Sequence, residues 1–249
     1  MLRSSRRWIE PLLFFVSLGL IWEWSVRYFQ VKPYLLPRLS DVFLAMWAQR
    51  ASLVGHAWVT LIEVIVGFTG AVIAGALLAM AIFFFPTLRR TLFPLITALQ
   101  SLPKVALAPL MIIWFGYGLT SKFVMSFLFA FFPIIIATLG GLSSTPSHLV
   151  EHFRALRASA WETTWRLRIP SALPNFLDGC RIAIPLSMIG AIVGEFVGAQ
   201  SGLGYVIMMT SSTSSTSLMF AALILVALMS TTLFLIFHAI SRLVWWRTV

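Results

Sequence analysis

Long apolar segments separated by short polar ones follow each other along almost the whole chain. Six of them are long enough to cross the core of a bilayer, about 30 Å, as an α-helix. They cover residues 8–28, 60–85, 92–115, 123–140, 179–199 and 218–240. The pattern therefore predicts an all-α, polytopic membrane protein with about six transmembrane helices.

The first apolar run follows three arginines, as the apolar part of a secretory signal peptide would. It is longer than such a segment, contains Glu10 and Glu23, and lacks a small-x-small cleavage site. We therefore expect it to be retained as a transmembrane helix.

An external amphipathic segment follows at residues 30–57. Ser40-Asp41 predicts the N-terminal cap of a helix that lies on the membrane surface. We assign residues 1–57 to the first helix and this segment, and residues 58–245 to one transmembrane domain.

The second and fifth apolar runs each carry small residues at four-residue steps, which places them on one helical face. They are Gly67, Ala71 and Gly75 in one run and Gly190, Gly194 and Gly198 in the other. Small residues let helix backbones approach closely in lipid. We expect close packing at both faces.

The third apolar run is interrupted near its middle. Prolines divide it and polar side chains gather at the break: Pro94, Pro103 and Pro109, with Gln100, Ser101 and Lys104. Irregular backbone at membrane depth is tolerated only against protein or a water-filled cavity. The run is therefore a candidate element of a translocation pathway.

Ionisable side chains inside a span cost at least about 2.5 kcal/mol, so they mark candidate sites. Glu23 and Glu63 lie near the outer ends of their predicted helices, where they can reach water. Three roles stay open for Lys104: it extends to a membrane surface, it pairs with a carboxylate, or it binds an anionic substrate. For Glu195 we expect a gate or helix-pairing role, with direct substrate contact as the alternative. The predicted pathway residues are Gln100, Ser101, Lys104 and Glu195.

Composition excludes an ordinary soluble domain, because 59% of the 249 residues are hydrophobic and only 10% are charged. The net charge of +10 does not indicate nucleic acid as a partner. With the N-terminus inside, twelve basic residues fall on the cytoplasmic side and five outside. This bias predicts that both termini are cytoplasmic.

The single cysteine, Cys180, excludes an internal disulfide and a cysteine-built metal site, and we expect no cofactor.

The most informative segment is the polar stretch at residues 142–176, between two apolar runs. Glu151, Arg154 and Arg157 recur at three-residue helical steps, and Trp161 and Trp165 follow. We expect Pro170 to end this amphipathic piece before the next span. A long excursion out of the membrane suggests that another protein docks there.

The spacing resembles the cytoplasmic motif of importer permeases of the ATP-binding-cassette class. That motif reads Glu-Ala-Ala, three residues, Gly, nine residues, Ile-x-Leu-Pro. Glu151 takes the Glu position, Arg157 the Gly position, and Leu167-Arg168-Ile169-Pro170 the closing position. His152, Phe153 and Arg157 depart from the motif.

Further blocks resemble the type I branch that imports nitrate, alkanesulfonates, taurine, and thiamine-precursor pyrimidines or riboflavin. These blocks are Leu102–Leu110 with Trp114–Gly116, and Gly194–Gly198 with Ser201–Tyr205. The resemblance covers roughly residues 35 to 245. It implies a permease subunit of a bacterial import system in the inner membrane, with a type-1 permease domain over residues 58–245.

The resemblance also implies partners: a homodimer of this chain in membrane lipid, two cytoplasmic ATPase subunits and an external solute-binding protein. The ATPase-coupling residues it implies are Glu151, Arg154, Ala155, Leu156, Arg157, Ala158, Ser159, Ala160, Trp161 and Glu162. No Gly-x4-Gly-Lys-Ser/Thr phosphate loop occurs in the chain, so we expect ATP hydrolysis on a separate polypeptide. The substrate stays open between sulfonates or nitrate and pyrimidine or flavin precursors.

Three alternatives stay open at position 157, where a glycine would permit a left-handed turn. Arg157 pairs with an acidic residue of its ATPase, or the turn has a different shape, or the turn has been lost. An ion-coupled carrier or a channel would need no ATPase. A membrane enzyme is a third class, because His148, Glu151 and His152 spell the His-x-x-Glu-His pattern of some zinc proteases.

Overall fold

The computed structural model describes residues 2–243, and these residues form helices and no strand. The elements in chain order are α1 (Leu2–Tyr28), α2 (Leu39–Ala48), α3 (Arg50–Phe84), α4 (Pro86–Gln100), the 3₁₀ turn η1 (Lys104–Leu107), α5 (Ala108–Phe115), α6 (Leu119–Ser143), α7 (Ser147–Ala155), α8 (Ala160–Thr163), the π-helical segment η2 (Thr164–Arg168), α9 (Ile169–Phe196), α10 (Leu203–Ser212) and α11 (Thr216–Leu243). The all-α prediction is confirmed.

Four helical segments are long and apolar enough to cross a membrane: Arg50–Phe84, Leu119–Ser143, Ala160–Phe196 and Thr216–Arg242. The pair α4 and η1–α5 makes a fifth span if it is counted as one broken helix. The remaining predicted span coincides with α1, which has 27 residues but does not belong to this set. The protein is therefore multi-pass, and the count of six stays a prediction.

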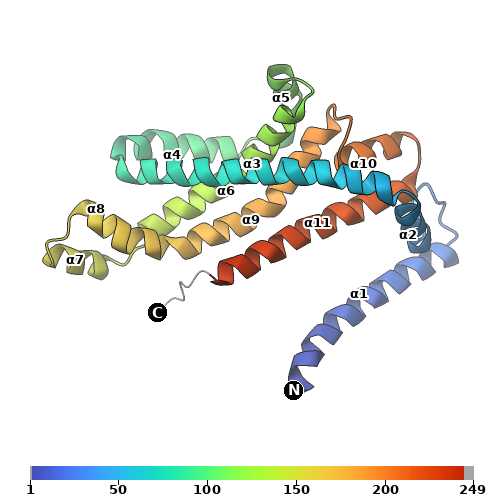
Figure 1. Cartoon of the computed structure of the whole chain (residues 1–249), viewed down its shortest axis with the longest axis horizontal. Helices are drawn as coiled ribbons and strands as arrows, with labels where there is room; N and C mark the ends of the chain where they lie inside the picture. The colour runs from blue at the N-terminus through green and yellow to red at the C-terminus, as the bar shows by residue number, and fades with distance from the viewer. Residues whose placement is uncertain (1, 244–249) are drawn as a thin grey trace.

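Helices α3, α6 and α9 form the centre of the bundle, with α11 beside them (Figure 1). Gly67 of α3 lies against Ser126 of α6, and an added Cβ there would come within 2.5 Å of the Ser126 side chain. Gly190 of α9 meets the Met125 backbone of α6, where a Cβ would lie 2.6 Å from the carbonyl oxygen. Close helix packing is confirmed at both faces, but Gly198 lies beyond the end of α9, contrary to expectation.

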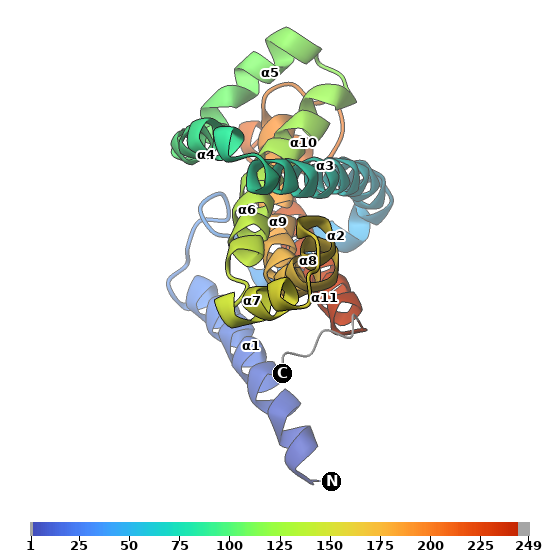
Figure 2. The ribbon, with the colours of Figure 1, turned by 90° about the vertical axis from the view of Figure 1, so that its left-hand side faces the viewer.

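The third predicted span is broken, as its prolines indicate. Helix α4 ends at Gln100, and after Pro103 the chain turns by 93° into η1 and α5. Pro94 is accommodated inside α4. Seen from the end of the bundle in Figure 2, α4 and α5 lie together at its outer edge, away from α1.

The N-terminus of α2 is held in a way that its sequence did not predict. Arg38, and not Ser40 or Asp41, is the capping residue, and it makes no side-chain hydrogen bond there. Instead Glu23 of α1 accepts hydrogen bonds from the Ser40 backbone N–H at 3.2 Å and hydroxyl at 3.0 Å. Glu23 also forms a 2.6 Å ion pair with Arg27 within α1, and its bonds to Ser40 join the end of α1 to α2.

Pro170 does not end the amphipathic piece, contrary to expectation. Helical structure is continuous from Ala160 to Phe196. A proline inside an α-helix clashes with the carbonyl four residues earlier and lacks an N–H. The wider π-helical turn at Thr164–Arg168, in which the Ile169 N–H donates to the Thr164 oxygen, lies directly before Pro170 and removes this conflict.

Candidate coupling surface and translocation pathway

The turn between α7 and α8 projects from one end of the bundle, opposite the end that carries α2 and α10 (Figure 1). Its apolar side chains are uncovered: Leu156 is 66% exposed and Trp161 62% exposed. Exposed bulky apolar side chains at a protruding turn are typical of a contact surface. The turn has the features expected of a docking element.

Arg157 adopts the left-handed conformation, with φ at 57°. Its N–H donates to the Arg154 oxygen at 2.9 Å, and the Ala158 N–H donates to the Phe153 oxygen at 3.0 Å. These two bonds form the Schellman motif that ends many helices, with Arg157 at the position where glycine is usual. The backbone here is therefore the one that the family's glycine would produce, and the alternative of a reshaped turn is wrong for this structure.

A capping box starts the second helix of the turn. The Ser159 hydroxyl accepts from the Glu162 N–H at 3.1 Å, and the Glu162 carboxylate accepts from the Ser159 N–H at 2.9 Å. The Ser-x-x-Glu spacing signals this cap in the sequence. Hydrogen bonds within the turn thus satisfy both helix ends.

The predicted pathway residues separate into two groups. Gln100 and Ser101 are exposed at the break between α4 and α5. Lys104 is half-buried, with Nζ 4.8 Å from the centre of the Phe132 ring and 5.6 Å from that of Phe129. A cation over two aromatic faces is stabilised by their quadrupoles. Both rings are buried, so the break offers one half-buried cation and two exposed polar side chains.

Glu195 lies apart from that group, fully buried between α3, α9 and α10. Its carboxylate accepts hydrogen bonds from the Thr60 hydroxyl at 2.6 Å and from the Gly204 N–H. Thr60 accepts in turn from the Leu203 N–H at 2.8 Å. Gly202 donates its N–H to His56 Nδ1 at 3.1 Å. Side chains from α3 and α9 therefore bind the otherwise unpaired N–H groups at the start of α10.

The expectation that Glu63 reaches water is wrong. Glu63 is fully buried beside Glu195 and close enough to Lys122 for their charges to interact. Neither carboxyl oxygen of Glu63 has a hydrogen-bond partner of ordinary geometry among the described residues. Lys122, which the charge distribution places outside, is 4% exposed, and its ammonium donates to the carbonyl oxygens of Tyr117 and Gly118 at 3.4 and 3.3 Å.

The zinc-protease pattern finds no support in the geometry. His152 and Glu151 are exposed on α7. Within residues 2–243, no group of three His, Cys, Asp or Glu side chains is placed to hold a metal ion.

Comparison with known proteins adds a family, two relatives and a solved structure. Residues 71–246 match the family of binding-protein-dependent transport system inner membrane components. The formylaminopyrimidine transport permease protein ThiX of Halalkalibacterium halodurans is 40% identical over 82% of each chain. The riboflavin transport system permease protein RibX of Chloroflexus aurantiacus is 34% identical over 97% of this chain and 92% of that one. A solved inward-facing MetNI methionine ABC transporter has the same fold, with a TM-score of 0.70 at 21% identity, over 79% of this chain and 98% of that one.

Proposed function

This chain belongs to the family of binding-protein-dependent transport system inner membrane components, a family of ABC importer permeases, and from that membership we propose how its parts divide the work of import. The α7–α8 turn docks on a cytoplasmic ATPase, and the broken span with Lys104 contacts the solute. The protein itself is a permease and hydrolyses no ATP; the ATPase is a separate chain.

The observation that carries the coupling proposal is the shape of the α7–α8 turn. The Schellman motif and the capping box hold it rigid, and Leu156 and Trp161 are exposed on it. A rigid protruding turn transmits a push from a partner, whereas a flexible one absorbs it. When the ATPase subunits close on ATP, the turn moves with them, and α9 carries the movement into the membrane because α8 continues into α9.

Leu156→Glu tests this docking. Detergent-solubilised tagged protein is isolated from its native cells, and the copurifying ATPase is quantified. A charge at this exposed apolar position is expected to remove the ATPase, because burying an unpaired carboxylate in an interface is costly. Ser212→Glu at the exposed end of α10 adds the same charge at the opposite end of the bundle and is expected to keep it. If no ATPase copurifies with the parent under gentle extraction, an ion-coupled carrier or a channel becomes the better hypothesis.

For the solute we propose a flat nitrogen heterocycle, such as a pyrimidine or flavin precursor. The substrates named for the relatives at 40% and 34% identity, formylaminopyrimidine and riboflavin, support this proposal. A sulfonate or nitrate is the second candidate, because the Lys104 ammonium attracts anions.

Lys104→Met separates the two candidates in proteoliposomes that contain the complete importer. Methionine keeps the length and apolar bulk of the side chain but removes its charge. Uptake of a heterocycle is expected to change by less than about threefold, whereas uptake of an anion is expected to fall at least tenfold, which corresponds to a lost charge-assisted hydrogen bond. Loss of heterocycle uptake together with retained anion uptake contradicts the assignment.

The proposed assembly contains two copies of this chain, two ATPases and one external solute-binding protein. Both termini and the α7–α8 turn then lie in the cytoplasm, and α2 and α10 lie near the outer surface. Cysteine accessibility at Ser159 and Ser212, measured with a membrane-impermeant reagent in intact cells, checks this orientation. We expect labelling of Ser212→Cys and not of Ser159→Cys. The opposite result would reverse the proposed orientation.

A further inference from the structure

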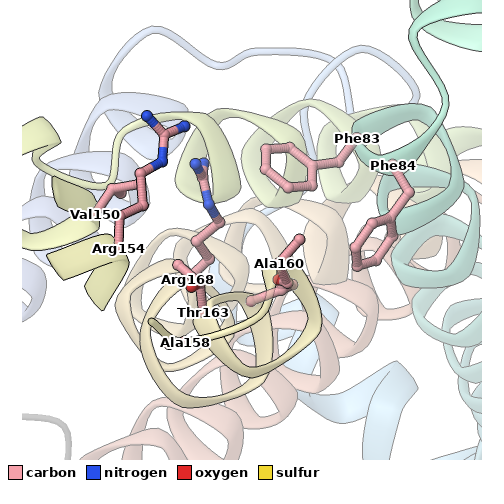
Figure 3. A pocket seen from close by; sticks show the side chains of 9 residues that line it. Phe83, Phe84, Val150, Arg154, Ala158, Ala160, Thr163 and Arg168 are labelled. Atoms are coloured by element: carbon pink, nitrogen blue, oxygen red, sulfur yellow. The ribbon is translucent and has the colours of Figure 1, made fainter. Parts of the chain in front are cut away.

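A cavity of about 350 Å³ lies between the end of α3 and the α7–α8 turn (Figure 3). Its lining combines two phenylalanines, two arginines and small or polar residues: Phe83, Phe84, Val150, Arg154, Ala158, Ala160, Thr163, Thr164 and Arg168. Figure 3 shows the guanidinium groups of Arg154 and Arg168 on one side and the rings of Phe83 and Phe84 on the other. The cavity therefore has a cationic and an aromatic wall.

The charges in the cavity are not neutralised from within the described residues. Neither of the two described ion pairs involves Arg154 or Arg168. Arg154 is exposed. Arg168 stacks over Phe83 at 5.0 Å and makes a 3.4 Å hydrogen bond to the Leu142 oxygen, which positions its guanidinium but leaves its charge uncompensated. The hydroxyls of Thr163 and Thr164 donate to the Ser159 and Ala160 carbonyls, so the arginines are the main donors that face a ligand.

Aromatic side chains beside the cavity indicate the membrane interface. Phe84 stacks on Trp161 with ring centres 6.2 Å apart, and Trp161 meets Trp165 at 5.4 Å. Both indoles are at least half exposed. Exposed tryptophans gather at the level of lipid headgroups. The cavity therefore lies at the end of a membrane-spanning helix, beside aromatic side chains of the kind found at headgroup level.

We propose that this cavity, the Arg154–Arg168 pocket, binds the phosphate group of an anionic phospholipid. The planar fork of a guanidinium matches the geometry of phosphate oxygens. Basic pockets between transmembrane helices are suited to anionic headgroups, and the Phe83–Phe84 wall contacts the apolar part of the lipid below its phosphate. A lipid held there braces the α7–α8 turn against α3.

The test is competition between two lipids for the purified full-length protein. Equal amounts of phosphatidylglycerol and phosphatidylcholine with the same acyl chains are added in detergent, and native mass spectrometry gives the ratio of bound species. The parent is expected to prefer phosphatidylglycerol. Arg154→Gln is expected to lower this preference about fivefold, or about 1 kcal/mol, which is the value of one basic residue near an anionic surface. Arg154 has no described partner, so its loss leaves the fold intact.

Arg166→Gln is the matched control, because Arg166 is an exposed cation on η2 that does not line the pocket. Its preference is expected to match that of the parent. An equal fall in both variants, or no preference in the parent, overturns the proposal. Displacement of the lipid by excess inorganic phosphate assigns the site to free phosphate instead. Release of the ATPase by Arg154→Gln with an unchanged lipid ratio shows that an acidic group of the ATPase fills the pocket, and this also overturns the proposal.

Discussion

The left-handed backbone at Arg157 makes a quantitative prediction about the α7–α8 turn. An L-residue in this conformation costs roughly 1–2 kcal/mol relative to the right-handed one, and glycine escapes that cost. Glycine also loses more entropy on ordering, by about 0.5–1 kcal/mol. Arg157→Gly is therefore expected to favour the ordered turn by about 0–1.5 kcal/mol, at most a factor of about twelve in its population.

Two further variants separate the backbone from the side chain. Arg157→Ala keeps the cost of the left-handed conformation but removes the guanidinium. Arg157→Pro fixes φ near −65° and removes the N–H that donates to the Arg154 oxygen, so the Schellman motif cannot form. The α7–α8 turn must then rebuild, and we expect a loss of at least about 3 kcal/mol, as for proline in a helix.

The assay is the Kd between the purified permease and its ATPase in detergent. Tighter or equal binding is expected for Arg157→Gly, binding close to the parent for Arg157→Ala, and a loss of about a hundredfold for Arg157→Pro. Thermal unfolding of each variant serves as the control for global folding. Unchanged affinity of the proline variant refutes the requirement for the turn. Equal losses for glycine and alanine instead show that the Arg157 side chain contacts the ATPase directly.

Three further predictions concern stability. Thr60→Val removes a hydrogen-bond partner from Glu195 and from the Leu203 N–H. We expect the unfolding free energy, measured by denaturation in detergent, to fall by about 1–3 kcal/mol. An unchanged value would mean that water replaces the hydroxyl. Gly202→Ala places a Cβ against the Glu195 carboxyl group, at a residue with a φ of 112°, and is expected to destabilise the protein by about 1–3 kcal/mol. Gly118→Ala is the control, because a Cβ there has no neighbouring atom within 4 Å. Similar effects of the two variants would contradict the packing argument. Ser159→Ala removes the N-terminal cap of α8 and is expected to lower the stability of this helix by about 1 kcal/mol. Hydrogen exchange in residues 160–168 should then be faster than in the parent, and exchange at the parent rate would contradict the prediction.

Sequence predicted those features of the fold that depend on local chemistry. Proline geometry requires a break near Pro103, and the structure turns there by 93°. The absence of a side chain at Gly67 and Gly190 permits close helix contact, and both glycines lie against α6. The spacing of the motif predicted the α7–α8 turn, although Arg157 departed from it. In each case the signal lay within one short stretch of the chain.

The failures at Ser40 and Glu63 have a different cause from that at Pro170, because both depend on partners far away in the chain. Ser40 is bonded by Glu23, 17 residues earlier. Glu195 is bonded by Thr60, 135 residues away, and Glu63 is covered by the same cluster. Hydropathy places such charges by depth in the bilayer and carries no information on which helix covers them. Glu63 and Glu195, two carboxyl groups inside predicted spans, were the sign in the sequence that a buried cluster exists.

The two ends of the bundle are joined by one continuous helical segment, Ala160–Phe196. At 1.5 Å per residue its 37 residues extend about 55 Å, which is longer than the hydrocarbon core is thick. One end is the proposed docking turn and the other carries Glu195, which holds the start of α10. The segment is not uniformly stiff, because η2 and Pro174 and Pro185 weaken its hydrogen-bond ladder. A displacement at the turn therefore has a direct route to Glu195, and these three points are where we expect α9 to bend when access to the pathway changes sides.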